Sequence, residues 1–333
     1  MTKIRLRETG GDAFVSRASC WLPVIVRESA WLEHAPFAFW LTAALRPRTV
    51  VELGVHRGFS YFAFCQAVQR LGFDTRCFAV DHWVGDAHAG FYGEDVYQDV
   101  RRQNRRYENF SQLIRADFSD AAATFADGGI DLLHIDGCHT YEAVRRDFET
   151  WLPKLSHRAV VLLHDTAEYQ QDFGVYLLWD ELRDRHPHFE FMHGHGLGVV
   201  GIGSDIPQPV RALFSASASA AASQAIRATY RRLGGLVGQL QGDDISALKL
   251  QMLRFQSMVT ACEARTSLSL TAPLRKLVRF ARFSRTAAGT AGAMLRDAAR
   301  GGARNARYQL KALPSRSSRP RPPEPRRRTR NTA

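Results

Sequence analysis

The chain has 333 residues, of which 45% are hydrophobic and 23% charged, so it can bury an ordinary globular core and wholesale disorder is excluded. No stretch reaches the roughly 18 apolar residues that span a bilayer, and the N-terminus has no apolar run of signal-peptide length. The five cysteines are odd in number and lack CxxC spacing, which indicates neither a disulfide framework nor a zinc site. We therefore expect a cytoplasmic protein without a transmembrane segment.

Charge is distributed unevenly along the chain. Residues 1–204 contain 21 Lys and Arg against 27 Asp and Glu, whereas residues 205–333 contain 24 against 6. All 12 histidines and all 6 tryptophans also lie in the first part. The sequence therefore predicts a mildly acidic globular domain followed by a basic extension rich in Ala and Arg. The net charge of +12 describes neither part.

The first predicted element is a helix over residues 29–45, which Ser29 could cap. Short apolar runs then alternate with helical patterns, as expected of parallel strands that are buried on both faces. The runs are residues 49–55, 77–80, 113–116, 130–135 and 159–163, with a helical pattern over 141–155. Residues 189–192 and 197–202 flank a Gly-rich turn and predict a closing antiparallel hairpin. This order predicts an open α/β sheet.

The composition changes after residue 204. A predicted helix follows Asp243-Asp244, a further basic helix begins at Pro273, and the Pro- and Arg-rich end predicts disorder. We divide the chain into an N-terminal segment (1–28), a main domain (29–204), a helical basic extension (205–312) and a disordered basic tail (313–333). Residues 205–333 could mediate oligomerisation or contact an anionic surface, and no pattern predicts a specific nucleic-acid site.

Acidic residues and glycines follow the apolar runs, at the sheet edge where ligands of open parallel sheets bind. Glu52, Gly54 and Gly58 accompany the first run, Asp81 ends the second, and Asp117 follows the third. The glycine spacing is not GxGxxG, which disfavours a dinucleotide site. Each residue alone could be a turn glycine or a helix cap. Their succession at three strand ends favours a nucleoside-type ligand.

Four motifs then occur in a recognisable order, and the chain resembles the class I S-adenosylmethionine-dependent methyltransferases. Within them it is similar to the sugar and macrolide-type O-methyltransferases found beside glycosyltransferases. The resemblance covers roughly residues 30–203. The motifs are Val51-Glu-Leu-Gly-Val-His-Arg-Gly, Asp81-His-Trp-Val-Gly-Asp, Leu133-His-Ile-Asp-Gly-Cys-His-Thr-Tyr-Glu and Leu163-His-Asp.

The resemblance implies a Rossmann-like sheet of seven strands with helices on both faces and an antiparallel last strand. It also implies S-adenosyl-L-methionine as the cofactor. Glu52, Gly54 and Gly58 would lie at the methionine end of the cofactor, Asp81 on the ribose, and Asp117 near the adenine.

The candidate catalytic groups follow the fourth and fifth runs. Asp136 and Asp165 leave neighbouring strands at the same edge, and their carboxylates suit Mg²⁺. Metal-dependent relatives use such acids together with a histidine base, which implies His139 as the general base here. An imidazole is near its working pKa without special tuning. His164 stands where those relatives carry an acid, so the candidate metal ligands are Asp136, Asp165 and His164.

Two of these assignments have structural alternatives. Asp136 could simply cap the helix that follows it, and His134 on the same strand is expected in the core. Residues 82–92 are rich in histidine and aromatic side chains. They could stack on an adenine or a sugar ring, or pack as a loop against the sheet edge.

The function that the resemblance implies is O-methylation of a sugar hydroxyl on a glycan or a glycosylated small molecule. One alternative is a non-sugar hydroxyl, such as that of a catechol. Another is a non-catalytic methyltransferase-like scaffold whose basic tail binds a polyanion. The presence of Glu52, Asp81, Asp136, His139 and Asp165 together argues against the scaffold.

Overall fold

The computed structural model describes residues 14–86, 88, 90–170, 172–241, 256–257 and 259–260. The basic helix from Pro273 and the tail over 313–333 lie outside these residues, as does most of the helix predicted after Asp244.

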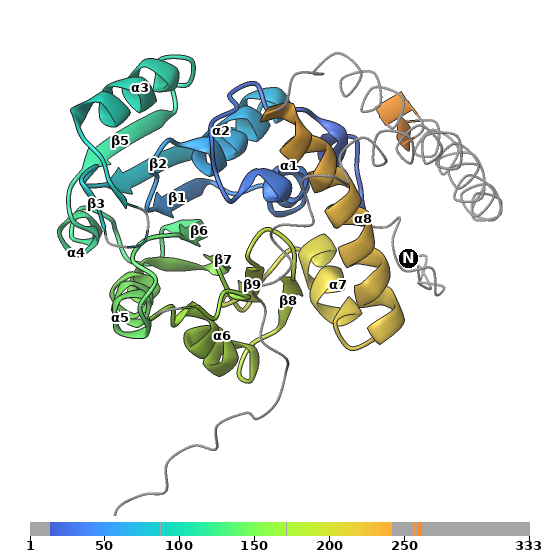
Figure 1. Cartoon of the computed structure of the whole chain (residues 1–333). Helices are drawn as coiled ribbons and strands as arrows, with labels where there is room; N and C mark the ends of the chain where they lie inside the picture. The colour runs from blue at the N-terminus through green and yellow to red at the C-terminus, as the bar shows by residue number, and fades with distance from the viewer. Residues whose placement is uncertain are drawn as a thin grey trace, which may run out of the picture. The chain divides into compact units, whose positions relative to one another are not determined.

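The central element is a mixed sheet of seven strands in the order β5-β2-β1-β6-β7-β9-β8 (Figure 1). All neighbours are parallel except β9, which runs antiparallel to both β7 and β8. The strands are β1 Thr49–Leu53, β2 Arg76–Asp81, β5 Ser111–Arg115, β6 Ile130–Ile135, β7 Leu155–His164, β8 His188–Phe191 and β9 Leu197–Gly201. This confirms the predicted fold class, the buried parallel strands and the closing hairpin.

Two layers of helices cover the sheet. Successive residues along each strand point to opposite faces of the sheet and so belong to two separate hydrophobic cores, one on each face. The first core includes α1, α2, α3, α7 and α8, and the second includes α4, α5 and α6. The helices are α1 Ala35–Leu45, α2 Phe59–Leu71, α3 Glu94–Asn104, α4 Phe118–Ala122, α5 Tyr141–Trp151, α6 Val175–Arg183, α7 Gln208–Ala216 and α8 Ala220–Gly238.

Short elements complete the described part. A small hairpin of β3 Gly85–Asp86 and β4 Gly90–Phe91 follows β2. The 3-10 helices are η2 Ala18–Cys20, η3 Leu32–His34, η4 Leu152–Lys154 and η5 Gln239–Gln241.

The first helix begins later than the sequence predicts. It starts at Ala35, with Pro36 in its first turn, where the missing N–H of proline has no consequence. Ser29 does not cap it: the Ser29 Oγ accepts a hydrogen bond from the Trp31 N–H in the preceding turn. The residues between form the 3-10 helix η3.

The packed core does not end at residue 204, so the predicted domain limit is wrong. Leu213 of α7 and Ile226 of α8 are buried in the same core as α1. Tyr230 of α8 donates a hydrogen bond of 2.6 Å to the Phe14 carbonyl, which ties the N-terminal segment to the same layer. The helices α7 and α8 lie within the predicted helical extension, but they pack as part of the folded domain.

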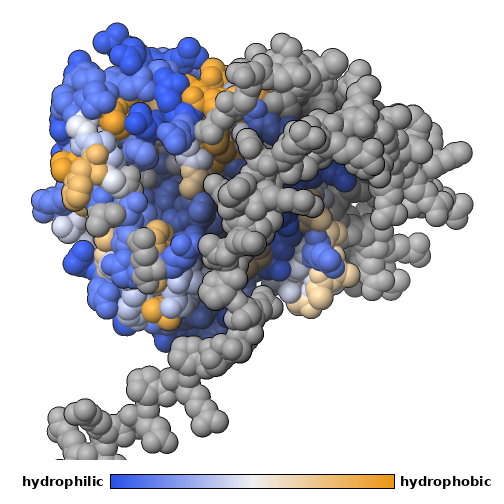
Figure 2. Space-filling model, in the orientation of Figure 1, coloured by the Kyte–Doolittle hydropathy of each residue, from blue (hydrophilic) through white to orange (hydrophobic). Residues whose placement is uncertain are grey.

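On the face seen in Figure 2, the described residues are mostly hydrophilic, with separate hydrophobic spots. Within the described residues, no helix combines the length and apolar character needed to cross a bilayer.

Candidate functional site

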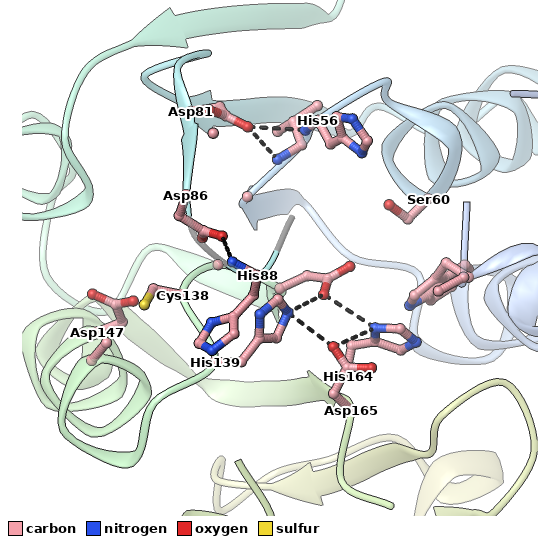
Figure 3. Close-up of a pocket in the computed structure, with 18 of the residues that line it drawn as sticks. His56, Ser60, Asp81, Asp86, His88, Cys138, His139, Asp147, His164 and Asp165 are labelled. Carbon is pink, nitrogen blue, oxygen red and sulfur yellow. Dashed lines mark hydrogen bonds and ion pairs between the residues drawn. The ribbon is translucent and has the colours of Figure 1, made fainter. Parts of the chain in front are cut away.

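A cavity of about 1230 Å³ opens at the carboxyl ends of β1, β2, β5, β6 and β7 (Figure 3). Of the residues singled out in the sequence, it is lined by Gly54, Gly58, Asp81, Asp117, Asp136, His139, His164 and Asp165. The structure therefore brings together at one sheet edge groups that are more than 100 positions apart in the chain.

The turn after β1 depends on its two glycines. Gly54 has a φ of +83°, and a Cβ there would lie 2.0 Å from the Asp136 carbonyl oxygen. Gly58 has a φ of +80° and precedes α2, where a Cβ would lie 2.6 Å from the Phe62 ring. Only glycine satisfies both the positive φ and the close approach. The strands β1 and β6 can thus end side by side under the cavity.

Asp81 anchors this turn to the end of β2. Its Oδ2 accepts hydrogen bonds from the backbone N–H groups of Val55 at 2.8 Å and His56 at 2.9 Å. Its Oδ1 accepts a third from the Trp83 N–H at 2.6 Å. A carboxylate offers about four acceptor positions. The Tyr92 hydroxyl donates a longer fourth bond of 3.4 Å to Oδ2, so Asp81 shapes the cradle, and a ligand hydroxyl could take the place of the weak Tyr92 bond.

Glu52 does not lie in the cavity wall, contrary to the sequence prediction. Alternation along β1 directs it toward the layer of α2, where it is fully buried. It accepts a hydrogen bond of 2.7 Å from the Ser60 Oγ and pairs at 2.9 Å with the Nδ1 of His134. Burial raises the pKa of Glu52, and His134 opposes that rise. Ser60, rather than Glu52, lines the cavity at this point.

Asp117 precedes α4, is exposed and lines the same cavity, and its place beside a nucleobase stays a prediction.

The catalytic candidates form a compact cluster. One ligand atom from each of Asp136, His139 and Asp165 lies within 4.8 Å of the others. The Nε2 of His139 is 2.9 Å from the Asp165 Oδ2 and 3.9 Å from the Asp136 Oδ1. Asp165 is itself in the left-handed region, with a φ of +62°. Such strain at a site is kept by its surroundings and accompanies function in many proteins.

His164 belongs behind this cluster. Its Nε2 is 3.0 Å from the Gly194 carbonyl oxygen, which can only accept, so this nitrogen carries a proton. Its Nδ1 faces Asp136 at 3.1 Å and Asp165 at 3.3 Å. Because both nitrogens face acceptors, His164 is a buried cation, and its pKa is raised well above the ordinary value by these carboxylates against the effect of burial. We correct its assignment from metal ligand to a hydrogen-bond partner of the two acids.

The protonation of His139 also differs from the sequence expectation. Burial lowers its pKa, but Asp136 and Asp165 together raise the pKa of His139 to about 10. At neutral pH the cluster therefore pairs two carboxylates with two imidazolium groups.

The donor set fits a divalent ion once His139 loses its proton. Two carboxylate oxygens and one imidazole nitrogen can converge on one point, and the other His139 nitrogen, Nδ1, is buried and has no partner among the described residues. Because this donor set includes an imidazole nitrogen, it suits transition metals better than Mg²⁺.

Two further residues of the site have weak signals in the sequence. Phe173 stacks on the His139 ring with centroids 4.8 Å apart. His88 lies against Phe173 and bonds Asp172 at 2.6 Å, joining the loop after β2 to the loop after β7. The histidine-rich stretch over 82–92 indicated His88, and no sequence pattern indicated Phe173.

The chain is similar to known proteins over part of its length. Residues 51–166 match the family model of a methyltransferase domain. The uncharacterized protein y4gI of Sinorhizobium fredii is 52% identical over 180 residues, which is 54% of this chain and 20% of that protein. The chain thus corresponds to about one fifth of that relative.

Solved structures show a partial likeness. A methyltransferase from Geobacter sulfurreducens is 17% identical, with a TM-score of 0.39 over 54% of this chain and 80% of its own. The O-methyltransferase TomG from Streptomyces achromogenes, solved with SAM, is 13% identical, with a TM-score of 0.40 over 54% of this chain and 92% of its own. Residues 51–166 therefore match a methyltransferase domain, and the strand order of the seven-stranded sheet fits the Rossmann-like fold of methyltransferases.

Proposed function

We propose that the protein transfers the methyl group of S-adenosylmethionine to a hydroxyl group of a small-molecule acceptor. One observation carries this proposal. A single cavity joins a glycine turn anchored by Asp81 to the acid–imidazole cluster of Asp136, His139 and Asp165. The first part suits a nucleoside cofactor, and the second can hold or remove a proton beside it.

The acceptor that we propose is a sugar hydroxyl on a glycan or a glycosylated small molecule. The wall near His139 combines carboxylates with the stacked ring of Phe173. Carboxylates bind neighbouring hydroxyls, and aromatic rings pack against sugar faces. A non-sugar hydroxyl is the second candidate, because Phe173 could equally stack on a flat ring.

The reaction is an in-line attack of the acceptor oxygen on the sulfonium methyl. The C–O bond forms as the C–S bond breaks, the electron pair returns to sulfur, and the hydroxyl proton must leave. In neutral His139 the Nε2–H donates to the Asp165 Oδ2 at 2.9 Å and holds the ring in place, and Nδ1, which has no partner among the described residues, accepts the hydroxyl proton. Alignment of two bound reactants supplies much of the remaining rate, roughly 7–11 kcal/mol at best.

A divalent ion held by Asp136, His139 and Asp165 would lower the pKa of a bound hydroxyl. His164, protonated on both nitrogens, bonds the Gly194 carbonyl through Nε2 and donates from Nδ1 to Asp136 and Asp165, which keeps the two acids oriented with or without the ion.

Two measurements test the proposal. Calorimetric titration with S-adenosylmethionine should show binding, and labelled methyl transfer to a panel of glycan acceptors should identify turnover. His139→Ala should lose roughly 10²–10⁴-fold in turnover with cofactor affinity kept. His157→Ala, which removes an exposed histidine, is the matched control and should leave turnover unchanged. No cofactor binding at high micromolar concentration would overturn the proposal.

The metal is tested separately. If an ion takes part, EDTA should abolish turnover and Mn²⁺ should restore it better than Mg²⁺. Full turnover after EDTA treatment would show that no metal ion takes part and that His139 removes the proton unaided.

A further inference from the structure

Two neighbouring histidines of the cavity each have a buried nitrogen without a hydrogen-bond partner in the described part of the chain. These atoms are the Nδ1 of His88 and the Nδ1 of His139. The two rings lie edge to face with centroids 5.4 Å apart, and both residues line the cavity (Figure 3). Buried polar groups nearly always have partners, so these atoms point to a ligand. The Nδ1 of His139 already has a role in proton removal, whereas the Nδ1 of His88 has none.

The bond to Asp172 fixes which nitrogen of His88 carries a proton. The Nε2 of His88 is 2.6 Å from the Asp172 Oδ1, and a carboxylate oxygen can only accept, so Nε2 donates. This bond lowers the pKa of Asp172, which keeps its carboxylate ionised. In the neutral ring of His88, Nδ1 is therefore a hydrogen-bond acceptor.

The ring of His88 is held in one place. Its side chain is only 5% exposed, and its backbone N–H donates to the Asp86 Oδ1 at 2.8 Å. The ring lies against Phe173, with centroids 4.7 Å apart, and Phe173 in turn stacks on His139. A group that is fixed before binding loses little freedom when a ligand binds, which favours recognition.

The loop after β7 that carries Asp172 and Phe173 is itself tied to the catalytic cluster. The Gly174 N–H donates a hydrogen bond of 2.8 Å to the His139 carbonyl. Gly174 also approaches the start of α5 so closely that a Cβ there would lie 2.5 Å from the Tyr141 nitrogen. The loop after β2 therefore delivers His88 to a fixed position beside His139.

Resting on the proposed function, we propose that His88 selects the acceptor by accepting, at Nδ1, a hydrogen bond from a second hydroxyl. This hydroxyl neighbours the one that is methylated. The reacting hydroxyl gives its proton to the Nδ1 of His139, and the contact between the two rings brings the adjacent hydroxyl beside His88. The acceptor class is thus a sugar or another compound with two adjacent hydroxyls. An acceptor with one hydroxyl would leave the His88 Nδ1 unpaired.

The test measures transfer of a labelled methyl group to pairs of small acceptors. Methyl glycosides of common hexoses are each compared with their monodeoxy counterparts, and catechol is compared with phenol. For an acceptor that reacts, loss of the neighbouring hydroxyl should lower kcat/KM by about tenfold or more, because it leaves a buried polar atom of the site unpaired. Loss of a more distant hydroxyl should have a much smaller effect.

Two substitutions separate the two nitrogens of His88. His88→Gln places its amide near the Nε2 position, where it can still bond Asp172, but has no atom at the Nδ1 position. The preference for the neighbouring hydroxyl should therefore fall toward one. His88→Asn places its amide near the Nδ1 position and should keep part of the preference. His157→Gln changes an exposed histidine and is the matched control, with both rates expected to stay as in the wild type.

A second set of measurements separates recognition from a role in holding the loops. Asp172→Ala removes the bridge between the loops but keeps the His88 Nδ1, so it should lower kcat/KM for both members of a pair and keep most of their ratio. NMR of the imidazole nitrogens is recorded with S-adenosylhomocysteine bound. Addition of the reacting acceptor should shift the Nδ1 signal of His88, which His88→Gln identifies by its loss, and the deoxy counterpart should not.

Each outcome decides between these roles. A preference retained in His88→Gln overturns the inference and leaves the proposed function standing. Equal loss for both members of a pair in His88→Gln and Asp172→Ala, with an unmoved His88 signal, assigns His88 to holding the loops and also overturns the inference. A wild-type protein that binds S-adenosylmethionine but methylates none of these hydroxyls overturns the proposed acceptor, and the inference with it.

Discussion

The two halves of the cavity are built by different means. In the half formed by β1, β2 and β5, the wall is mainly backbone, positioned by Gly54 and Gly58 and tied by Asp81 to three N–H groups. In the half formed by β6 and β7, the wall consists of titratable side chains, with Asp136 and Asp165 facing two imidazoles. The shape of the first half is therefore set by backbone geometry, whereas the second half is defined by the charges of its side chains.

The half of the cavity formed by β6 and β7 also depends on helices that follow the last strand. The β7–β9–β8 side is covered by α7 and α8, and Arg227 of α8 donates a hydrogen bond of 2.6 Å to the Glu190 carbonyl of β8. Gly234 of α8 approaches the Glu33 carbonyl so closely that a Cβ there would lie 2.2 Å from it. These contacts make the acid–imidazole half depend on residues far beyond the last strand.

The largest expected effect follows from this dependence. A chain that ends after Ser204 should fail to fold, because α7 and α8 bury seven apolar side chains in the shared core. At about 1.5–3 kcal/mol each, their burial matches the whole stability of a typical domain, about 5–15 kcal/mol. Circular dichroism and thermal melting of this chain, beside one that ends after Gln241, measure it. A soluble, cofactor-binding chain that ends at 204 would show that these helices are dispensable.

The next effect tests the backbone half. Gly54→Ala should lower the free energy of unfolding by about 3 kcal/mol or more, since it adds a clash with the Asp136 carbonyl to the strain of a positive φ. Gly72→Ala is the control: its φ is +65°, and nothing lies within 4 Å of the added Cβ. That change should cost only the strain, about 1–2 kcal/mol. Equal losses in urea denaturation would show that the close approach of β1 to β6 is not required.

The third effect tests the titratable half. The neutral form of His139 is the base, and its pKa is raised to about 10. We therefore expect kcat/KM to increase with pH up to about 10, changing tenfold for each pH unit below that value. An unperturbed imidazole would give a plateau above about pH 6.5. The pH profile of kcat/KM is measured after EDTA treatment and again with added Mn²⁺. Because Mn²⁺ binds the neutral imidazole, it should shift the rise of kcat/KM to lower pH. A plateau from about pH 7 in the metal-free protein would contradict the raised pKa.

The sequence predicted the backbone half better than the titratable one, for a physical reason. Buried parallel strands leave continuous apolar runs, so the places of Gly54 and Asp81 at the ends of β1 and β2 can be read directly. The charge of His139 depends on Asp165, which is distant in sequence and approaches only in the folded sheet.

Glu52 and α8 show two other limits of the sequence. Glu52 precedes a strand end, but side-chain alternation turns it away from the cavity toward Ser60. In α8, Ile226, Tyr230, Leu233 and Val237 repeat at helical spacing and form a buried stripe. The surrounding alanines and arginines masked this stripe, although the periodicity could have revealed it.

The smallest expected effect concerns Asp81, where the two kinds of wall meet. Asp81→Ala should weaken S-adenosylmethionine binding by roughly 10–100-fold, because a charge-assisted hydrogen bond is worth about 1.5–3 kcal/mol. The loss has two sources: an acceptor for ribose hydroxyls and the anchor of the Val55 and His56 N–H groups. Asp81→Asn keeps one acceptor oxygen and should recover part of the affinity, and Asp120→Ala, an exposed acid on α4, should bind as the wild type does. Calorimetric titration of the three folded variants measures these differences. If Asp81→Ala binds the cofactor as tightly as the wild type, Asp81 neither holds the ribose nor shapes the turn, and the cofactor half of the cavity must lie elsewhere.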